Sequence, residues 1–204
     1  MYRESNFLPE WVSPGHRSCM VGNNSASIVA DAYLSGLRGY DAETLWQAVV
    51  HGANAVHPKV PSTGRLGFEE YNKLGYVPCD VGINESAART LEYAYDDWCI
   101  AELAKKLGKK DDEAIYRKRA ASFENLFNPA KKAFYPKYAD GRWHEDLVMN
   151  SWDALQPHYI SGNFWDYEYY LPHAIDRLVD LKGGKKEFEN SLDTLFNTEL
   201  KMVG

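Results

Sequence analysis

The sequence has few cysteines, no long apolar run and no excess of basic residues, and each absence excludes a class of protein. The three cysteines include no CxxC pair, so zinc-site spacing is excluded and at most one disulfide can form within the chain. No export signal is visible at the start, and no apolar stretch is long enough to span a membrane. The net charge of −6 excludes the basic surface typical of proteins that bind nucleic acids.

Aromatic residues, by contrast, are abundant, because six Trp, fourteen Tyr and eight Phe make up 14% of the chain. Such side chains can line a sugar-binding cleft, but they also fill large helical cores, and we favour the core. The length of 204 residues predicts one domain or a piece of a larger one. The six histidines show no HExxH pairing, so they do not indicate a zinc protease.

Helical periodicity runs through most of the sequence and predicts an all-α fold of six to eight helices. The segments that carry it are 25–41, 41–56, 68–75, 86–107, 111–127, 163–183 and 185–196. Asp41 is placed to cap one helix and Asn84 to cap the long helix that Gly108 ends. Pro172 either kinks its helix or begins a new one.

Two segments are predicted to be non-helical. Residues 56–64 contain Pro58 and Pro61 and are expected to form a loop. Residues 127–145 place an Asn-Pro and an Asp-Gly turn signal around short aromatic runs, which predicts a small aromatic hairpin lobe.

The stretch TLEYAYDDWC, residues 90–99, places three carboxylates among aromatic side chains inside the predicted long helix. Glu92, Asp96 and Cys99 recur at i, i+4 and i+7, so they share one side of that helix. Apolar burial raises the pKa of a carboxyl group. Glu92, near the helix start and facing a cleft, would therefore suit the role of a general acid.

The same helix carries two apolar sets that cover more than a single stripe, so we expect much of its surface to be buried. A structural alternative stays open for its other two carboxylates. Asp96 and Asp97 can form ion pairs with neighbouring helices, for example through Arg89 or Arg117.

Four segments, in order, resemble family 92 of the glycoside hydrolases, the calcium-dependent exo-acting α-mannosidases: MVGNNSASIVADAYLSGLRGYD, LGYVPCD, TLEYAYDDWCIAELAKKLGKKDD and GNFWDYEYYLPH. The resemblance is most specific from residue 90 to 112. It implies that residues 1–204 form part of an (α/α)6 toroid. It also implies that the N-terminal β-sandwich and the C-terminal part of the toroid are absent from this chain.

The resemblance further implies an inverting mechanism. One carboxylic acid protonates the leaving oxygen, and a second carboxylate, roughly 6.5–9.5 Å away, activates water. Glu92 resembles the general acid of the family. The motif that carries the catalytic base is missing here, so we expect the isolated chain to be nearly inactive.

The run Ser161–Tyr167 matches the family motif EGNAWQY, which contributes to the sugar and calcium site. By the resemblance, Asn163 is a calcium ligand and Trp165 a substrate contact. Asp166, which stands at the family's glutamine, is a further substrate contact and can serve as a calcium ligand. The implied cofactor is calcium and the implied partner is a mannose-containing glycan.

Asn24 and Tyr93 are the other substrate contacts that the resemblance implies, although Asn24 stands where the family has a histidine. Ser161 replaces a glutamate and Ala174 an aspartate. These departures motivate a second hypothesis, a non-catalytic carbohydrate-binding or interaction module, and a helical scaffold without a sugar role is a third. Exposed inner faces of a partial toroid predict self-association. The family implies an extracytoplasmic location.

Overall fold

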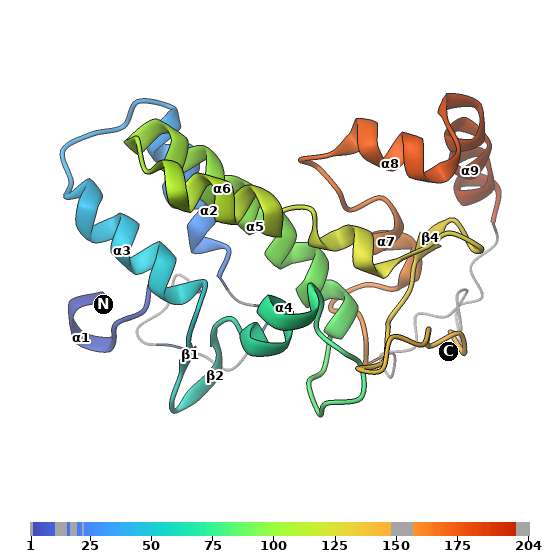
Figure 1. The fold of residues 1–204 in the computed structure, drawn as a ribbon, viewed down its shortest axis with the longest axis horizontal. Helices are drawn as coiled ribbons and strands as arrows, with labels where there is room; N and C mark the ends of the chain where they lie inside the picture. Colours follow the sequence, from blue (N-terminus) through green and yellow to red (C-terminus); the bar gives the residue numbers. More distant parts are fainter. Residues whose placement is uncertain (1, 11–15, 17–19, 22, 148–156, 199–204) are drawn as a thin grey trace.

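The computed structural model describes residues 2–10, 16, 20–21, 23–147 and 157–198, and its regular structure is mainly helical (Figure 1). The helices are α1 (Tyr2–Ser5), α2 (Ser25–Leu34), α3 (Ala42–Gly52), α4 (Phe68–Leu74), α5 (Ser86–Leu107), α6 (Lys110–Arg119), the 3-10 helix η1 (Ser122–Leu126), α7 (Phe164–Glu168), α8 (Ile175–Lys182) and α9 (Lys185–Asn197). The strands β1 (Val56–His57) and β2 (Val60–Gly64) pair antiparallel, as do β3 (Phe127–Asn128) and β4 (Ala133–Phe134).

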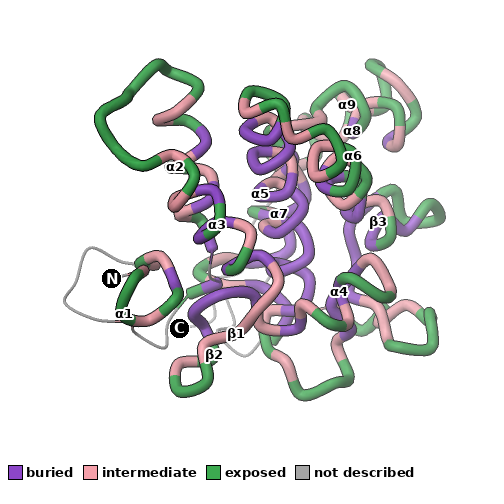
Figure 2. Tube along the Cα trace, turned by 60° about the vertical axis from the view of Figure 1, so that its left-hand side comes forward, coloured by how far each residue is buried: buried purple, intermediate pink, exposed green. Residues whose placement is uncertain are grey.

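The longest helix, α5, lies at the centre, with α2 and α6 packed along it (Figure 1). Buried residues follow most of its length, as Figure 2 shows. Five of its alanines are buried, and these small side chains let the neighbouring helices approach closely. The predicted bounds and the predicted burial of this helix are both confirmed, and Gly108, with φ of 73°, ends it.

Two main cores lie along α5. The first, around Leu91 and Phe134, joins the N-terminal half of α5 to η1, the β3–β4 hairpin, α7 and α8. The second, around Ile100 and Trp46, joins its C-terminal half to α2, α3 and α6. The aromatic residues are therefore used mainly in the core, as expected from the sequence.

The two predicted helix caps have different outcomes. The Asp41 carboxylate accepts a hydrogen bond from the Thr44 amide at 3.0 Å, so its capping role is confirmed. The prediction for Asn84 is wrong, because Glu85 occupies the capping position with φ of 57° and makes no side-chain cap. The Ala88 amide instead donates to the carbonyl of His158 at 3.0 Å. A segment distant in the sequence thus replaces the local cap.

The prediction of a loop for residues 56–64 is wrong, because these residues form the β1–β2 hairpin. The pairing jumps from His57 opposite Val60 to Val56 opposite Gly64, so Pro61 falls in an irregular stretch that requires no amide donor. The hairpin predicted near 127–145 is confirmed, since β3 pairs with β4 and a further bridge joins residues 137 and 143.

Pro172 separates two helices, since α7 ends at Glu168 and α8 begins at Ile175. No helix among the described residues is long and apolar enough to cross a membrane. Large apolar side chains are exposed at Ile28 (70%), Leu37 (61%) and Phe196 (83%). Self-association through such surfaces stays a prediction.

Candidate functional site

Glu92 lies on α5 and is half-buried, next to Tyr170, which packs against the first core. Its Oε2 accepts a hydrogen bond of 2.7 Å from the hydroxyl of Tyr170, which belongs to the segment between α7 and α8. The break at Pro172 keeps this segment out of a continuous helix, and the Tyr170 ring meets α5 there. Two parts of the chain that are distant in sequence therefore converge on this carboxyl group.

The environment of Glu92 favours a protonated carboxyl group. Burial raises its pKa, and the hydrogen bond from Tyr170, which stabilises the charged form, opposes that rise. No cation forms an ion pair with Glu92 among the residues that the structure describes. A carboxyl group with these properties can hold a proton and release it to a basic atom nearby.

Aromatic rings surround this position. Tyr170 meets Tyr95 edge-on, with ring centroids 6.4 Å apart, and lies 5.9 Å from Tyr167. Tyr95 stacks on Trp98 at 6.3 Å, and His173 lies 6.0 Å from Tyr95. Two aromatic side chains of TLEYAYDDWC, Tyr95 and Trp98, thus belong to the cluster that holds Tyr170, the hydrogen-bond partner of Glu92.

Asp96 lies one helical turn beyond Glu92 and is completely buried. Neither of its carboxyl oxygens has a hydrogen-bond partner within the described residues. Burial raises the pKa of Asp96 well above its ordinary range, the Arg65 charge opposes this, and Glu92 adds to it. Burial therefore favours the neutral form of Asp96.

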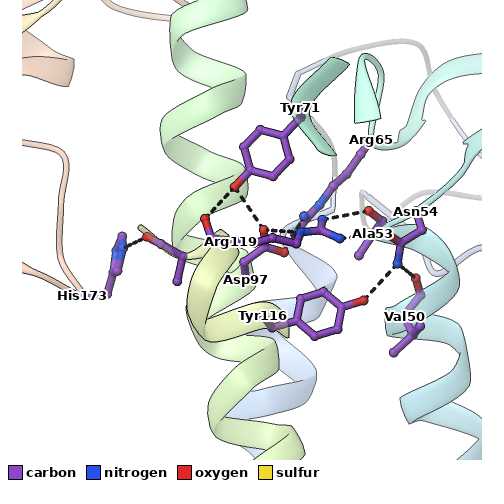
Figure 3. A network of polar contacts seen from close by, with 10 residues as sticks. Val50, Ala53, Asn54, Arg65, Tyr71, Asp97, Tyr116, Arg119 and His173 are labelled. Atoms are coloured by element: carbon purple, nitrogen blue, oxygen red, sulfur yellow. Dashed lines mark hydrogen bonds and ion pairs between the residues drawn. The ribbon is translucent and has the colours of Figure 1, made fainter. Parts of the chain in front are cut away.

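Asp97 is the centre of a buried polar network that Figure 3 shows. Its Oδ1 accepts from Arg65 Nη1 at 2.5 Å, and its Oδ2 accepts from the Tyr71 hydroxyl at 3.0 Å and from Arg119 Nε at 2.9 Å. Arg119 also donates to Asn54 Oδ1 at 2.8 Å. The network fixes α5 to α4, α6 and the end of α3.

Asp97 does form ion pairs with neighbouring segments, so the structural alternative is confirmed for this residue. The prediction that Arg89 or Arg117 would be the partner is wrong. Arg89 pairs with Glu85, at 2.8 Å, and Arg117 with Glu102. Asp96 forms no ion pair with either arginine. The actual partners lie on other segments, and helical spacing along α5 gives no information about them.

The predicted calcium ligand and one predicted substrate contact hold the start of α7. Asn163 Oδ1 accepts from the Trp165 amide at 2.8 Å, and Asp166 Oδ2 accepts from the Asn163 amide at 2.7 Å. Together they form a capping box. No group of three or more His, Cys, Asp or Glu side chains able to hold a metal occurs within the described residues.

The other predicted substrate contacts are dispersed. Asn24 is exposed at the start of α2, without a side-chain cap. Tyr93 is completely buried, and its hydroxyl donates to the Leu66 carbonyl at 3.1 Å, so the structure gives it a packing role. Trp165 is half-buried and lines a cavity that Glu92 does not line. Substrate contact by Asn24, Tyr93, Trp165 and Asp166 stays a prediction.

Tyr170 is the residue at this site that the sequence did not single out. It lies in the run DYEYYLPH, one of four tyrosines between residues 159 and 170. Nothing in that run distinguishes the tyrosine that meets Glu92, because the contact depends on how α7 packs against α5. Pro172, two residues after Tyr170, is the only local sequence signal that the helix ends near this tyrosine.

Over nearly its whole length the chain is similar to known proteins of one family. Residues 1–203 match the model of the glycosyl hydrolase family 92 catalytic domain. The chain is similar to an inverting family 92 mannosidase from Bacteroides thetaiotaomicron, with 41% identity and a TM-score of 0.88 over 95% of this chain and 26% of that one. A family 92 α-mannosidase of the same organism, solved with mannoimidazole, shows 31% identity and a TM-score of 0.84, over 97% of this chain and 26% of that one.

A further relative is described as an uncharacterized secreted glycosidase of Arthroderma benhamiae. It is 29% identical over an alignment of 233 positions, which covers all of this chain and 30% of that protein. The chain thus spans between about a quarter and a third of the length of the relatives it matches.

Proposed function

Because the chain belongs to family 92 of the glycosyl hydrolases, we propose that it forms part of the helical toroid of an inverting exo-α-mannosidase acting on mannose-containing glycans. Glu92 is the general acid in this proposal. The single observation that carries the assignment is the half-buried Glu92 carboxyl group, which has a raised pKa and a hydrogen bond from Tyr170. The mannosidases to which the chain is similar support the choice of substrate.

In the proposed reaction, protonated Glu92 donates its proton to the glycosidic oxygen as the bond to the anomeric carbon breaks. Water attacks that carbon from the opposite face, and the catalytic base that takes its proton lies outside this chain. Glu92 becomes a carboxylate during this step. The Tyr170 hydroxyl, already 2.7 Å from Oε2, stabilises the charge that develops, because hydrogen bonds to ionised acceptors are the stronger ones.

Calcium dependence is part of the proposal, and the described residues fit a calcium site only in part. Asn163 and Asp166 bring side-chain oxygens close together, but each already accepts an amide hydrogen bond. Calcium takes six to eight oxygen ligands. These two side chains do not make a site, and no step of the proposed reaction passes through the metal.

An extracytoplasmic location is also proposed, with support from the relative described as secreted. A non-catalytic carbohydrate-binding module is the second candidate. The departures from the family pattern at Ser161, Ala174 and Asn24 motivate it.

Hydrolysis of 4-methylumbelliferyl α-mannoside, whose leaving group benefits from acid assistance, tests the assignment. Because the base is proposed to lie outside the chain, the assay includes sodium azide, which attacks the anomeric carbon without a base. Wild-type protein is compared with Glu92→Gln, and each is assayed with calcium and with chelator.

We expect azide-dependent release of the fluorophore by wild-type protein and loss of at least about a hundredfold of that rate in Glu92→Gln, within the range typical of general acids. Equal rates for the two proteins would contradict the role of Glu92. A rate that chelator leaves unchanged would remove calcium from the proposal and leave the acid in place.

A further inference from the structure

A buried ion pair lies two residues before Tyr170 in the sequence. Lys182, the last residue of α8, bonds through Nζ to Oε1 of Glu168, the last residue of α7. Their exposed fractions are only 3% and 4%. Lysine and glutamate are seldom buried this deeply unless they are paired. The contact therefore belongs to the interior of the fold and differs from the ion pairs at its surface.

Both side chains also bind the backbone of the β3–β4 hairpin. Lys182 Nζ donates to the carbonyl of Lys132 at 3.2 Å, and Glu168 Oε2 accepts from the amide of Phe134 at 3.3 Å. The pair thus joins the ends of α7 and α8 to one hairpin. A displacement of α7 relative to α8 would leave a buried charge without its partner, and such a charge is strongly destabilising.

The restraint extends to the residue after Glu168. The ring centroid of Tyr169 lies 4.9 Å from Lys182 Nζ. The same ring packs edge-on against Phe188 of α9, with centroids 5.9 Å apart. Two consecutive residues at the end of α7 are therefore held by Lys182, one through its charge and one through its ring.

Tyr170 follows this anchored stretch directly, in a tight turn. Its amide donates to the Tyr167 carbonyl at 3.1 Å, and the Leu171 amide donates to the Tyr169 carbonyl at 2.9 Å. The position of the Tyr170 backbone therefore depends on the position of α7. Its hydroxyl reaches Glu92 at 2.7 Å from there. Such O–H···O bonds lie between about 2.5 and 3.0 Å, so a small displacement of α7 is enough to weaken the contact.

We propose that the Lys182–Glu168 ion pair positions the Tyr170 hydroxyl on Glu92. Neither member of the pair touches the reacting atoms, so both are positioning residues that act through Tyr170. The role of Glu92 as the general acid rests on the proposed function, whereas its link to the ion pair rests on the contacts alone. A measurement on the carboxyl group itself therefore tests the link separately from hydrolysis.

The titratable groups that interact with Glu92 are Asp96 of α5, Tyr167 of α7 and Tyr170. Among the described residues, only Tyr170 forms a hydrogen bond with the carboxyl group. Lys182 does not interact with Glu92 directly. Its substitution should therefore change the pKa of Glu92 by moving Tyr170.

The test is the pKa of the Glu92 carboxyl group, measured by carbon-13 NMR titration of the full chain. Lys182→Met removes the ammonium group and keeps an apolar side chain of similar length. Because it leaves Glu168 buried without its partner, the double variant Glu168→Gln/Lys182→Met, which leaves no buried charge, is measured as well. Arg177→Met is the matched control, since it removes the exposed ion pair of α8 with Glu124, at 2.8 Å.

We expect the pKa of Glu92 to rise by about half a unit to one unit in both Lys182 variants, because a displaced Tyr170 hydroxyl no longer stabilises the carboxylate. Arg177→Met should leave the pKa unchanged. In a Tyr170→Phe background the Lys182 substitution should have no further effect, since substitutions that act through one shared contact are not additive.

An unchanged pKa of Glu92 in the folded double variant would overturn the proposal. An equal rise with and without the Tyr170 hydroxyl would also overturn it, because the effect would then not pass through that contact. Failure of Glu92→Gln to slow mannoside hydrolysis would remove the general acid and leave this coupling in place, so the two proposals fail by different results.

Discussion

The hydroxyl of Tyr170 donates a hydrogen bond of 2.7 Å to Oε2 of Glu92, across 78 positions of sequence. This contact joins the N-terminal part of α5 to the segment between α7 and α8. It gives Glu92 a partner that stabilises its charged form, while burial stabilises its neutral form. The balance of these two effects sets the pH at which Glu92 gives up its proton.

Tyr170→Phe should therefore raise the pKa of Glu92, because it removes the donor and leaves the burial. The alkaline limb of azide-dependent mannoside hydrolysis should move up by about half a unit to one unit, the effect of one hydrogen bond to a charged group. Tyr167→Phe is the control, since the Tyr167 hydroxyl bonds to the Ile160 carbonyl instead. A downward shift in Tyr170→Phe would show that this contact does not stabilise the carboxylate.

Asp97→Asn should destabilise the fold strongly, because it leaves the buried Arg65 guanidinium without its counter-ion. Loss of one partner of a buried ion pair costs about 3–5 kcal/mol of unfolding free energy. Urea unfolding measures it. Glu113→Gln, which breaks a more exposed pair of 3.6 Å with Arg117, should cost less than about 1 kcal/mol. Equal effects of the two substitutions would refute the structural importance of the Asp97 network.

His158 should contribute a loss of stability as the pH falls from about 6.5 to about 4. Burial and the nearby His144 lower the pKa of His158 from 6.5 to about 4. In that window the unfolded chain binds a proton that the folded chain does not, so stability is lost as the pH falls.

The substitution His158→Gln should reduce the pH-dependent loss of unfolding free energy by about 1–2 kcal/mol. This figure allows for the partial access of solvent to the ring. The measurement is the free energy of unfolding in urea at several pH values. His51→Gln, at an exposed position, is the matched control. An unchanged slope in His158→Gln would show that the folded protein protonates this ring readily.

Asn163 caps α7 and is also the predicted calcium ligand. Two substitutions at this position distinguish the two roles. Asn163→Ala should lower the free energy of unfolding by about 1 kcal/mol without calcium, whereas Asn163→Asp should preserve it, because Asp caps equally well. Thermal unfolding with and without calcium gives both values. Equal stability of the Ala and Asp variants would mean that the capping box contributes nothing measurable.

The sequence predicted the elements that depend on local signals. The bounds of α5, the Asp41 cap and the hairpin near 127–145 all follow from periodicity, capping chemistry or turn residues. The wrong predictions depend on distant contacts. The carbonyl of His158 replaces Asn84 as the cap of α5, and the irregular pairing of the β1–β2 hairpin accommodates Pro61.

At the candidate site, sequence reasoning singled out Glu92 and its burial but missed its partner, Tyr170. Glu92 stands out because a carboxyl group among aromatic side chains in an apolar helix is unusual. Tyr170 does not, because it is one tyrosine among several and its contact depends on packing between helices. The same limit applies to Arg65 and Arg119, the partners of Asp97, which lie on other elements.

The most direct test of the central claim is the pKa of the Glu92 carboxyl group, measured in the isolated chain by carbon-13 NMR titration. The signal is assigned by its absence from Glu92→Gln. The structure predicts a midpoint above the ordinary 4.5, since burial outweighs the hydrogen bond from Tyr170. A midpoint at or below 4.5 would contradict the account, because a carboxyl group ionised throughout the neutral range cannot supply a proton to a leaving sugar.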